Sequence, residues 1–292
     1  RETRSPPAGV AASSQYDPEF DRPVFIVSSP RAGSTLLFET LAQARGLYTI
    51  GQESHALIEG MPALNPGLRG YDSNRLPASA ATRAVTQELR QRMWDELRDR
   101  EGAAPTGAPV RVLEKTPKNA LRVPFLAEVF PQARFVYLYR DLRQTLSSMI
   151  EAWQSGRFCT YAGLPAWEGL PWSMLLVPGW RDLKGRSLQQ IVAAQWEITT
   201  QILLDDLSAL PAGRCQVVHY DEFLANPAGE LARLCDSLDL PWDRPLDQAL
   251  PLSRYTVSKP AADKWRRHVD LIEEVLPALQ ATSDRAERFT GH

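Results

Sequence analysis

The chain has 292 residues, of which 43% are hydrophobic and 23% are charged, and its formal net charge is −2. This composition is typical of a globular enzyme that buries a sizeable core. The near-neutral charge excludes a whole-molecule attraction to nucleic acid or to an anionic membrane surface, so an anion site in this chain has to be built from local clusters of side chains.

Cysteine usage and hydropathy give expectations about the compartment. The three cysteines, Cys159, Cys215 and Cys235, form no CxxC pair, and free thiols in apolar stretches are typical of proteins in a reducing compartment. The sequence contains no run of 18 or more apolar residues and no pattern of a secretory signal. We therefore expect a cytoplasmic protein with no membrane and no nucleic-acid partner.

The domain organisation is expected to be simple. Residues 1–21 are rich in Pro, Ala and Ser, which offer little to pack, so they are predicted to be a linker or disordered tail. Such a linker is compatible with a piece of a longer polypeptide or with a trimmed chain. Residues 22–292 are predicted to form a single domain.

Short hydrophobic runs alternate with helical patterns along the chain. The first run, Val24–Val27, is continuously apolar, as in a strand buried on both faces of a parallel sheet, and helical spacing follows over residues 34–45. Similar runs at 110–113, 135–139 and 217–220 each precede a polar turn and another helical pattern. This alternation predicts an α/β fold with a central parallel sheet flanked by helices.

Two irregular stretches interrupt this alternation. The longest helical pattern covers residues 187–209, and the segment before it, 151–186, is broken by Gly and Pro and rich in aromatic residues. It is too long for an ordinary connection and is predicted to be a lid over a substrate. A second irregular stretch, 56–80, is expected to face it.

The loop 28–35, SSPRAGST, lies between the first predicted strand and the helix that follows. Backbone N–H groups, a helix N-terminus, two hydroxyls and a cation at such a point can hold a phosphate. The loop is not a Walker A motif, because Arg31 precedes Gly33 and no Lys follows it, so ATP or GTP hydrolysis loses its main support. Taken alone, the loop is equally compatible with a plain tight turn.

This loop resembles the 5′-phosphosulfate loop of sulfotransferases that use 3′-phosphoadenosine 5′-phosphosulfate (PAPS). The segment 135–148, FVYLYRDLRQTLSS, resembles the 3′-phosphate motif of the same family, with Arg140 and Ser148 at the matching places. An Arg offers a planar fork for a phosphate, and a hydroxyl two turns into the next helix can reach the same anion.

Two further segments resemble catalytic motifs of the family. Residues 114–117, EKTP, resemble the Lys-containing segment of tyrosylprotein and related bacterial sulfotransferases, which implies that Lys115 contacts the sulfuryl group and the bridging oxygen. Residues 51–55, GQESH, resemble the segment that carries their catalytic Glu, here Glu53. His55 stays an alternative base or helper, because an imidazole with a pKa of about 6.5 suits proton transfer at neutral pH. Cytosolic sulfotransferases have a His just after the second-motif Lys, where this chain has Pro117.

The C-terminal part of the chain carries two more resemblances. Residues 218–242 resemble a late strand-and-helix signature of the family, which places Tyr220 near the adenine. Residues 256–268 resemble the basic loop that closes over the nucleotide, although the cluster KWRRH at 264–268 is also compatible with a solvated helix face. The residues that this loop would contribute are Lys259, Lys264, Trp265 and Arg266.

Together these matches imply a PAPS-dependent sulfotransferase with a P-loop-like nucleotide-binding fold and a helical or loop lid. In-line transfer of the sulfuryl group to an acceptor hydroxyl would use Glu53 as general base, with Lys115 and Arg31 stabilising the charge that develops. No metal is expected. The residues expected to hold the 5′-phosphosulfate are Arg31, Ala32, Gly33, Ser34 and Thr35.

The acceptor and two other functional classes stay open at this point. Lipid, peptide, carbohydrate and natural-product alcohols, or an amine, fit the motifs, and so does a hydroxyl on an acyl chain bound to a carrier protein of a multidomain synthase. The other classes are a P-loop-like small-molecule kinase and a non-catalytic nucleotide-binding or carrier-docking domain.

Overall fold

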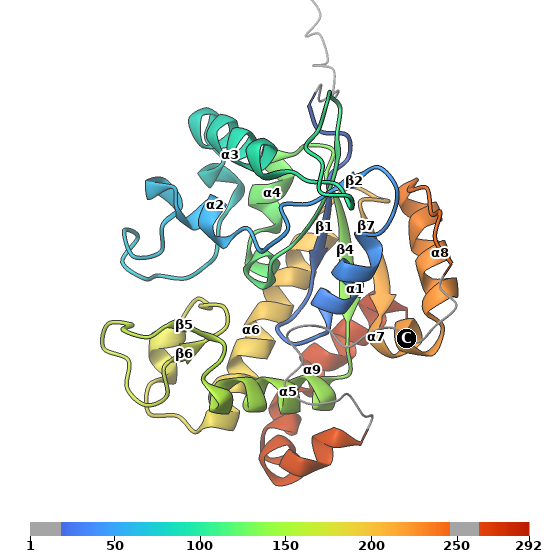
Figure 1. Cartoon of the computed structure of the whole chain (residues 1–292). Helices are drawn as coiled ribbons and strands as arrows, with labels where there is room; N and C mark the ends of the chain where they lie inside the picture. Colours follow the sequence, from blue (N-terminus) through green and yellow to red (C-terminus); the bar gives the residue numbers. More distant parts are fainter. Residues whose placement is uncertain (1–18, 246–262, 292) are drawn as a thin grey trace, which may run out of the picture.

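The computed structural model describes residues 19–245 and 263–291, and its centre is a five-stranded sheet (Figure 1). All four neighbouring strand pairs are parallel, in the order β2-β3-β1-β4-β7. The predicted central parallel sheet is therefore confirmed. The strands are β1 (Val24–Val27), β2 (Leu47–Tyr48), β3 (Arg111–Lys115), β4 (Arg134–Tyr139) and β7 (Cys215–His219).

Alternating side chains of these strands form one core on each face of the sheet. Phe25 and Val27 of β1 belong to a cluster with helices α3 (Arg83–Glu96), α4 (Val123–Val129), α6 (Leu188–Ser208) and α9 (Val269–Thr290). Val24 and Ile26 belong to the opposite cluster, with helices α1 (Ser34–Leu41), α7 (Tyr220–Ala225) and α8 (Pro227–Leu238). Because both faces are covered, the central strands read as continuous apolar runs.

A third core lies below the sheet in Figure 1, beside helix α5 (Leu142–Ser155) and the hairpin β5 (Cys159–Tyr161) and β6 (Trp172–Ser173). Three tryptophans are buried here, and Trp172 contacts both Trp153 and Trp180 edge to face. The aromatic residues of the predicted lid segment 151–186 therefore form a packed core of their own.

The second irregular stretch, 56–80, faces this segment, as expected. It contains helix α2 (His55–Glu59) and the short 3₁₀ helices at Pro62–Leu64 and Ala78–Ala80. Two backbone N–H groups hold the stretches together: Asn74 N donates to Leu176 O at 2.8 Å, and Leu176 N donates to Asn74 Oδ1 at 2.6 Å.

Three predicted boundaries were wrong. Phe20 lies in the expected linker 1–21 but is fully buried against Trp94 and Phe130. The large aromatic ring packs in the core, although the polar residues around it in the sequence give no indication of this. Helix α1 ends at Leu41 and not at residue 45. Tyr220 begins α7 and does not end the strand before it.

Candidate active site

The candidate catalytic and binding residues lie at the carboxyl ends of the parallel strands. The loop 28–33 follows β1, Lys115 is the last residue of β3, and Arg140 follows β4. These strands are neighbours in the sheet, so the segments that leave them meet at one edge, which is where open α/β sheets place their ligands.

The loop after β1 contains a glycine in a left-handed backbone conformation. Gly33 has φ 97°, a left-handed value, and directly precedes helix α1. A Cβ atom at this position would lie 2.2 Å from the ring of Tyr220, so no other residue fits without moving the ring. Tyr220, predicted to lie near an adenine, is buried and has its ring against this loop.

The two guanidinium groups of the predicted donor site lie together. Arg140 Nη1 donates to the backbone oxygen of Arg31 at 3.0 Å, and Arg31 Nε donates to Ser148 Oγ at 3.3 Å. The Arg31 guanidinium also lies 4.3 Å from the ring centroid of Phe158, and that of Arg140 lies 4.5 Å from the ring of Tyr220. Two arginines far apart in the sequence thus form one cationic cluster, with the hydroxyl of Ser148 beside it.

Electrostatics give this cluster a preference for an anion. Burial, and then the charge of Arg140, lower the pKa of Arg31 to about 10. Burial also lowers the pKa of Arg140, although Tyr220 and Asp221 oppose this effect. Two partly desolvated like charges destabilise each other, so an anion between them would relieve both the repulsion and the lost hydration.

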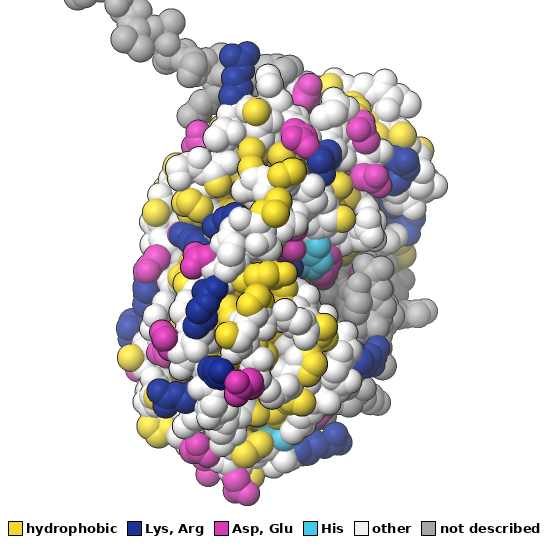
Figure 2. All heavy atoms as spheres, turned by 90° about the vertical axis from the view of Figure 1, so that its left-hand side faces the viewer, with side chains coloured by type: hydrophobic (Ala, Val, Ile, Leu, Met, Phe, Trp, Pro, Cys, Tyr) yellow, Lys and Arg dark blue, Asp and Glu magenta, His cyan; other side chains and the backbone are white. Residues whose placement is uncertain are grey.

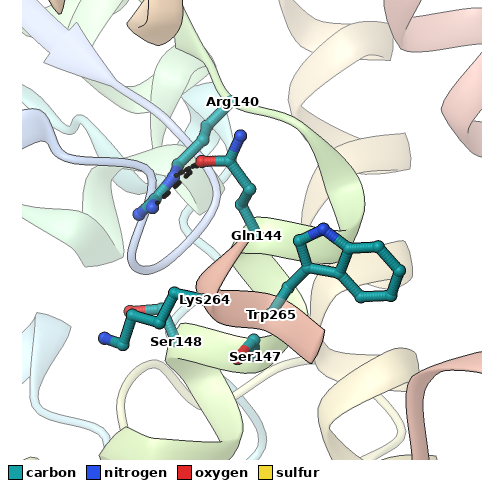
Figure 3. Close-up of a pocket in the computed structure, with 6 residues that line it drawn as sticks. All are labelled: Arg140, Gln144, Ser147, Ser148, Lys264 and Trp265. Carbon is teal, nitrogen blue, oxygen red and sulfur yellow. Dashed lines mark hydrogen bonds between the residues drawn. The ribbon is translucent and has the colours of Figure 1, made fainter. Parts of the chain in front are cut away.

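A small pocket, open to solvent, lies beside Arg140 (Figure 3). Arg140 donates through Nε and Nη2 to Gln144 Oε1, both at 3.2 Å. Four of the six lining residues were predicted from the sequence motifs, whereas Gln144 and Ser147 lie within the segment 135–148 but at positions to which no role was assigned. The lining residues are Arg140, Gln144, Ser147, Ser148, Lys264 and Trp265.

The remaining residues of the predicted basic loop are placed differently. Arg266 does not line the pocket, and its guanidinium lies 5.2 Å from the ring centroid of Trp265. Lys259 lies outside the described residues. The cluster 264–268 forms a short 3₁₀ helix, η5, that packs on helix α5.

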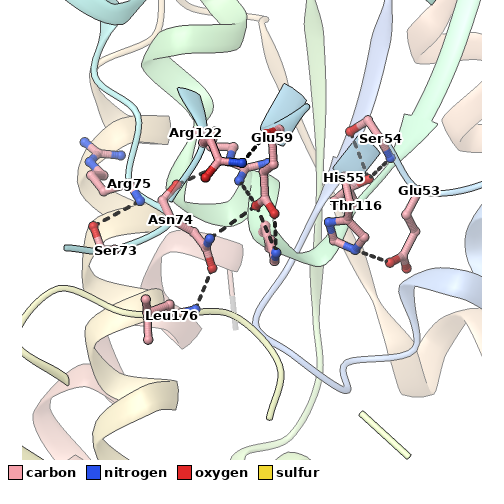
Figure 4. A network of polar contacts seen from close by, with 12 residues as sticks. Glu53, Ser54, His55, Glu59, Ser73, Asn74, Arg75, Thr116, Arg122 and Leu176 are labelled. Atoms are coloured by element: carbon pink, nitrogen blue, oxygen red, sulfur yellow. Dashed lines mark hydrogen bonds and ion pairs between the residues drawn. The ribbon is translucent and has the colours of Figure 1, made fainter. Parts of the chain in front are cut away.

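The predicted catalytic residues form a connected set at the end of β3. Lys115 Nζ donates to Glu53 Oε1 at 2.5 Å, and the other carboxylate oxygen, Oε2, lies 2.7 Å from His55 Nε2 (Figure 4). The Lys115 side chain is 3% exposed and that of Glu53 is 21% exposed. Burial raises the pKa of Glu53, but the hydrogen bond from His55 and the charge of Lys115 outweigh it and lower the pKa to about 2.

The residues next to Glu53 and Lys115 are also joined by hydrogen bonds. Ser54 N donates to Thr116 Oγ1 at 2.7 Å, and Thr116 Oγ1 in turn donates to the buried carboxyl group of Glu114. Lys115 at the end of β3 and Thr116 directly after it thus hold the neighbouring residues Glu53 and Ser54. No sequence pattern predicted this role of Thr116, because a Thr after a strand can have many roles.

A second polar network, also drawn in Figure 4, lies beside the first. Glu59 accepts from Lys118 Nζ at 2.8 and 2.9 Å and from Arg122 Nη2 at 2.6 Å, and all three side chains are largely buried. Asn74 Nδ2 donates to the hydroxyl of Tyr161 at 2.7 Å. The network ties helix α2 to the hairpin β5–β6 next to Glu53.

Within residues 19–245 and 263–291, no group of three or more His, Cys, Asp and Glu side chains is placed to hold a metal ion. The same part of the chain has no helix with the length and apolarity needed to cross a bilayer.

Solved structures with the same fold are sulfotransferases. A sulfotransferase from Alicyclobacillus acidocaldarius aligns with a TM-score of 0.52 at 14% identity, over 93% of this chain and 96% of that chain. A sulfotransferase domain from the curacin biosynthetic pathway aligns with a TM-score of 0.48 at 18% identity, over 87% of this chain and 98% of that chain. The similarity to the Alicyclobacillus acidocaldarius structure confirms the P-loop-like sulfotransferase fold expected from the motifs.

Curated relatives carry the name protein-tyrosine sulfotransferase. Protein-tyrosine sulfotransferase A of Caenorhabditis elegans is 24% identical over 221 residues, which are 75% of this chain and 50% of that protein. The enzyme of Drosophila melanogaster is also 24% identical over 221 residues, which are 38% of its length. The chain thus spans half or less of the length of these two relatives.

These relatives contradict the expected location. Protein-tyrosine sulfotransferases are membrane-resident enzymes of the Golgi, so the prediction of a cytoplasmic protein was wrong. The prediction was based on free cysteines and on hydropathy. These are properties of this stretch of sequence and do not identify the compartment in which a protein resides.

The family itself follows from a match that covers most of the chain. The model of the sulfotransferase family matches residues 23–244, which include the loop after β1, the segment of Glu53, and the Lys115 and Arg140 motifs. The order of these motifs and the fold agree with that match. The chain belongs to the sulfotransferase family.

Proposed function

We propose that the chain transfers the sulfuryl group of PAPS to an acceptor hydroxyl by in-line displacement. The observation that carries the proposal is the meeting of Arg31, Arg140 and Ser148 at the ends of β1 and β4, with the pair Glu53 and Lys115 at the end of the adjacent strand β3. A cationic cluster next to a carboxylate suits a donor with two anionic ends and an acceptor that must lose a proton.

The donor would lie across the carboxyl ends of the strands. Arg31 and the loop residues Ala32, Gly33, Ser34 and Thr35 would hold the 5′-phosphosulfate, because the loop ends in a helix N-terminus. Arg140, Ser148 and the pocket residues Lys264 and Trp265 would hold the 3′-phosphate. Tyr220 would support this arrangement through its contacts with Gly33 and Arg140.

Glu53 would accept the proton of the acceptor hydroxyl. The acceptor oxygen forms a bond to sulfur while the bond from sulfur to the bridging oxygen breaks, and the electron pair of that bond stays on the 5′-phosphate. Lys115 and Arg31 would stabilise this negative charge, as cations do in phosphoryl transfer. The products would be a sulfate ester and adenosine 3′,5′-bisphosphate.

The low pKa of Glu53 has to rise for this role. Lys115 and His55 hold the carboxylate ionised in the structure, which makes it a weak base. When Lys115 binds the bridging oxygen, its hydrogen bond to Glu53 weakens, and burial then raises the carboxylate pKa. The arrangement would therefore make Glu53 a stronger base once the donor is bound. His55 would remain its partner at Oε2.

The acceptor is proposed to be a hydroxyl that enters beside Glu53 and His55. The curated relatives are named for protein tyrosine, so a tyrosine phenol is the first acceptor to test. A hydroxyl on a carrier-bound acyl chain is the second. Figure 2 shows hydrophobic side chains gathered in the middle of one face, next to a histidine with acidic and basic neighbours, which suits an acceptor with an apolar body.

Thermal unfolding with different nucleotides tests the donor. A ligand present at a hundred times its dissociation constant adds about 2.7 kcal/mol to the free energy of unfolding. We expect PAPS to raise the melting temperature, adenosine 5′-phosphosulfate to raise it less, and Arg140→Met to remove the difference between the two. Arg285→Met, which removes an exposed ion pair between α6 and α9, is the matched control. Protection by ATP with Mg²⁺ but not by PAPS would contradict the proposal.

A further inference from the structure

Helix α5 brings a carboxylate to the pocket that faces Arg140. Ser147 and Ser148 come three and four residues after Gln144, and Glu151 comes four and three residues after them, so the four lie along one face of the helix. The first three line the pocket. No motif includes Glu151, and the chemistry proposed above does not use it.

Glu151 holds a cation of the same pocket. Its Oε2 lies 2.8 Å from Lys264 Nζ, and both side chains are 14% exposed. Lys264 comes from the 3₁₀ helix η5, which also contacts α5 through Ser147 Oγ and His268 Nδ1 at 2.9 Å. The charge of Glu151 further opposes the lowering of the pKa of Arg31 and of Arg140 that burial causes. Glu151 therefore acts on three cations at once.

We infer that Glu151 is a binding-site residue that weakens the hold of this pocket on a nucleotide 3′-phosphate by competing for Lys264. The inference rests on the proposed function, because it takes the pocket beside Arg140 to be the 3′-phosphate site. A phosphate that enters between Arg140, Ser148 and Lys264 meets an ammonium group whose charge is partly cancelled. The carboxylate of Glu151 lies next to that ammonium group.

The functional consequence concerns release of the product. Donor and product carry the same 3′-phosphate, so a pocket that holds this group too tightly would retain adenosine 3′,5′-bisphosphate after transfer. Product release limits the turnover of many enzymes. In the free protein Glu151 forms an ion pair with Lys264, and this ion pair can form again when the nucleotide dissociates.

The test is titration calorimetry of the wild-type chain and Glu151→Gln with adenosine 3′,5′-bisphosphate. Gln keeps the size of the side chain and removes its charge. We expect the dissociation constant to fall by about fivefold to tenfold, which corresponds to one lost charge contact at a partly buried site. Adenosine 5′-monophosphate, which lacks the 3′-phosphate, should bind equally well to both proteins. Weaker or unchanged binding of the bisphosphate to Glu151→Gln would overturn the inference.

Three further measurements separate this role from a structural one. In the background of Lys264→Met, the gain from Glu151→Gln should shrink, since the competition for Lys264 is gone. Asp205→Asn, which breaks an exposed ion pair with Arg285, is the matched control and should change nothing. If Glu151→Gln does not fold, Glu151→Asp replaces it, because the shorter side chain loosens the contact with Lys264 and should give a smaller gain. A wild-type chain that binds no bisphosphate refutes the proposed function itself.

Discussion

At the scale of single residues, the carboxylate of Glu53 is strongly perturbed by its two charged or polar partners. One oxygen accepts from Lys115 and the other contacts His55, and these contacts lower its pKa from 4.5 to about 2. A group whose pKa is lower in the folded than in the unfolded state stabilises the fold above its unfolded pKa. This contribution disappears as the pH falls through the folded pKa.

Replacement of Glu53 by Gln should therefore have an effect on stability that depends on pH. At pH 7 we expect Glu53→Gln to lower the free energy of unfolding by about 2 kcal/mol, since the buried Lys115 loses its charged partner. The difference from wild type should stay constant down to about pH 5 and decline between the unfolded pKa of 4.5 and the folded value of about 2. Urea denaturation at pH 7, 5, 4 and 3 measures it, and an equal difference at pH 7 and pH 3 would refute the account.

Gly33 makes a second prediction at this scale. Gly33→Ala places a methyl group 2.2 Å from the ring of Tyr220 and also forces Ala to a φ of 97°. Gly46 has a φ of 78° but no atom within 4 Å of its virtual Cβ, so Gly46→Ala isolates the backbone strain, which costs about 1 kcal/mol. We expect Gly33→Ala to be more destabilising than Gly46→Ala and, unlike it, to reduce PAPS binding. Equal melting temperatures for the two variants would show that the loop tolerates a side chain.

At the scale of elements, Asn74 joins the two irregular stretches that flank the candidate site. Its backbone N–H donates to Leu176 O, its Oδ1 accepts from Leu176 N, and its Nδ2 donates to Tyr161. These bonds are buried, so they connect the segment after α2 to the hairpin β5–β6 without help from solvent.

Removal of this bridge should be costly. Asn74→Ala leaves the backbone N–H of Leu176 and the hydroxyl of Tyr161 without these partners, and we expect a loss of about 2–4 kcal/mol in the free energy of unfolding. Asn65→Ala, at a more exposed position of the same stretch, should cost about 1 kcal/mol or less. Chemical denaturation of both variants measures the difference. A loss below 1 kcal/mol for Asn74→Ala would mean that the two stretches are held by other contacts.

The strands that are buried on both faces of the sheet could be predicted from the sequence. Val24–Val27 was predicted with its observed bounds, because a central strand of a covered sheet is continuously apolar. Strand β2 has two residues and leaves no readable pattern. Helix α3 buries only Val85, Leu89 and Met93, so its apolar stripe is narrow, and it was not predicted.

At the scale of the whole molecule, the site could be predicted only as far as its motifs reach. The motifs named Arg31, Arg140 and Ser148, and the parallel sheet brings them together. Contacts between side chains of different motifs could not be predicted from the sequence. The contact of Lys115 with Glu53, for example, depends on how the segment after β2 crosses the end of β3. Glu151 belongs to no motif, and it enters the site only through the packing of η5 on α5.

The net charge of the whole molecule does not favour nucleotide binding, unlike the local charge at the candidate site. With a net charge of −2, the chain offers an anionic nucleotide no long-range attraction, so binding must arise from the cluster at the sheet edge.

A crystal structure of the chain with adenosine 3′,5′-bisphosphate tests the account most directly. The account predicts one phosphate between Arg140, Ser148 and Lys264, and the other on the loop of Arg31 and Gly33, with Lys115 within reach. A nucleotide bound away from the ends of β1 and β4, or one that contacts only one of the two arginines, would contradict it.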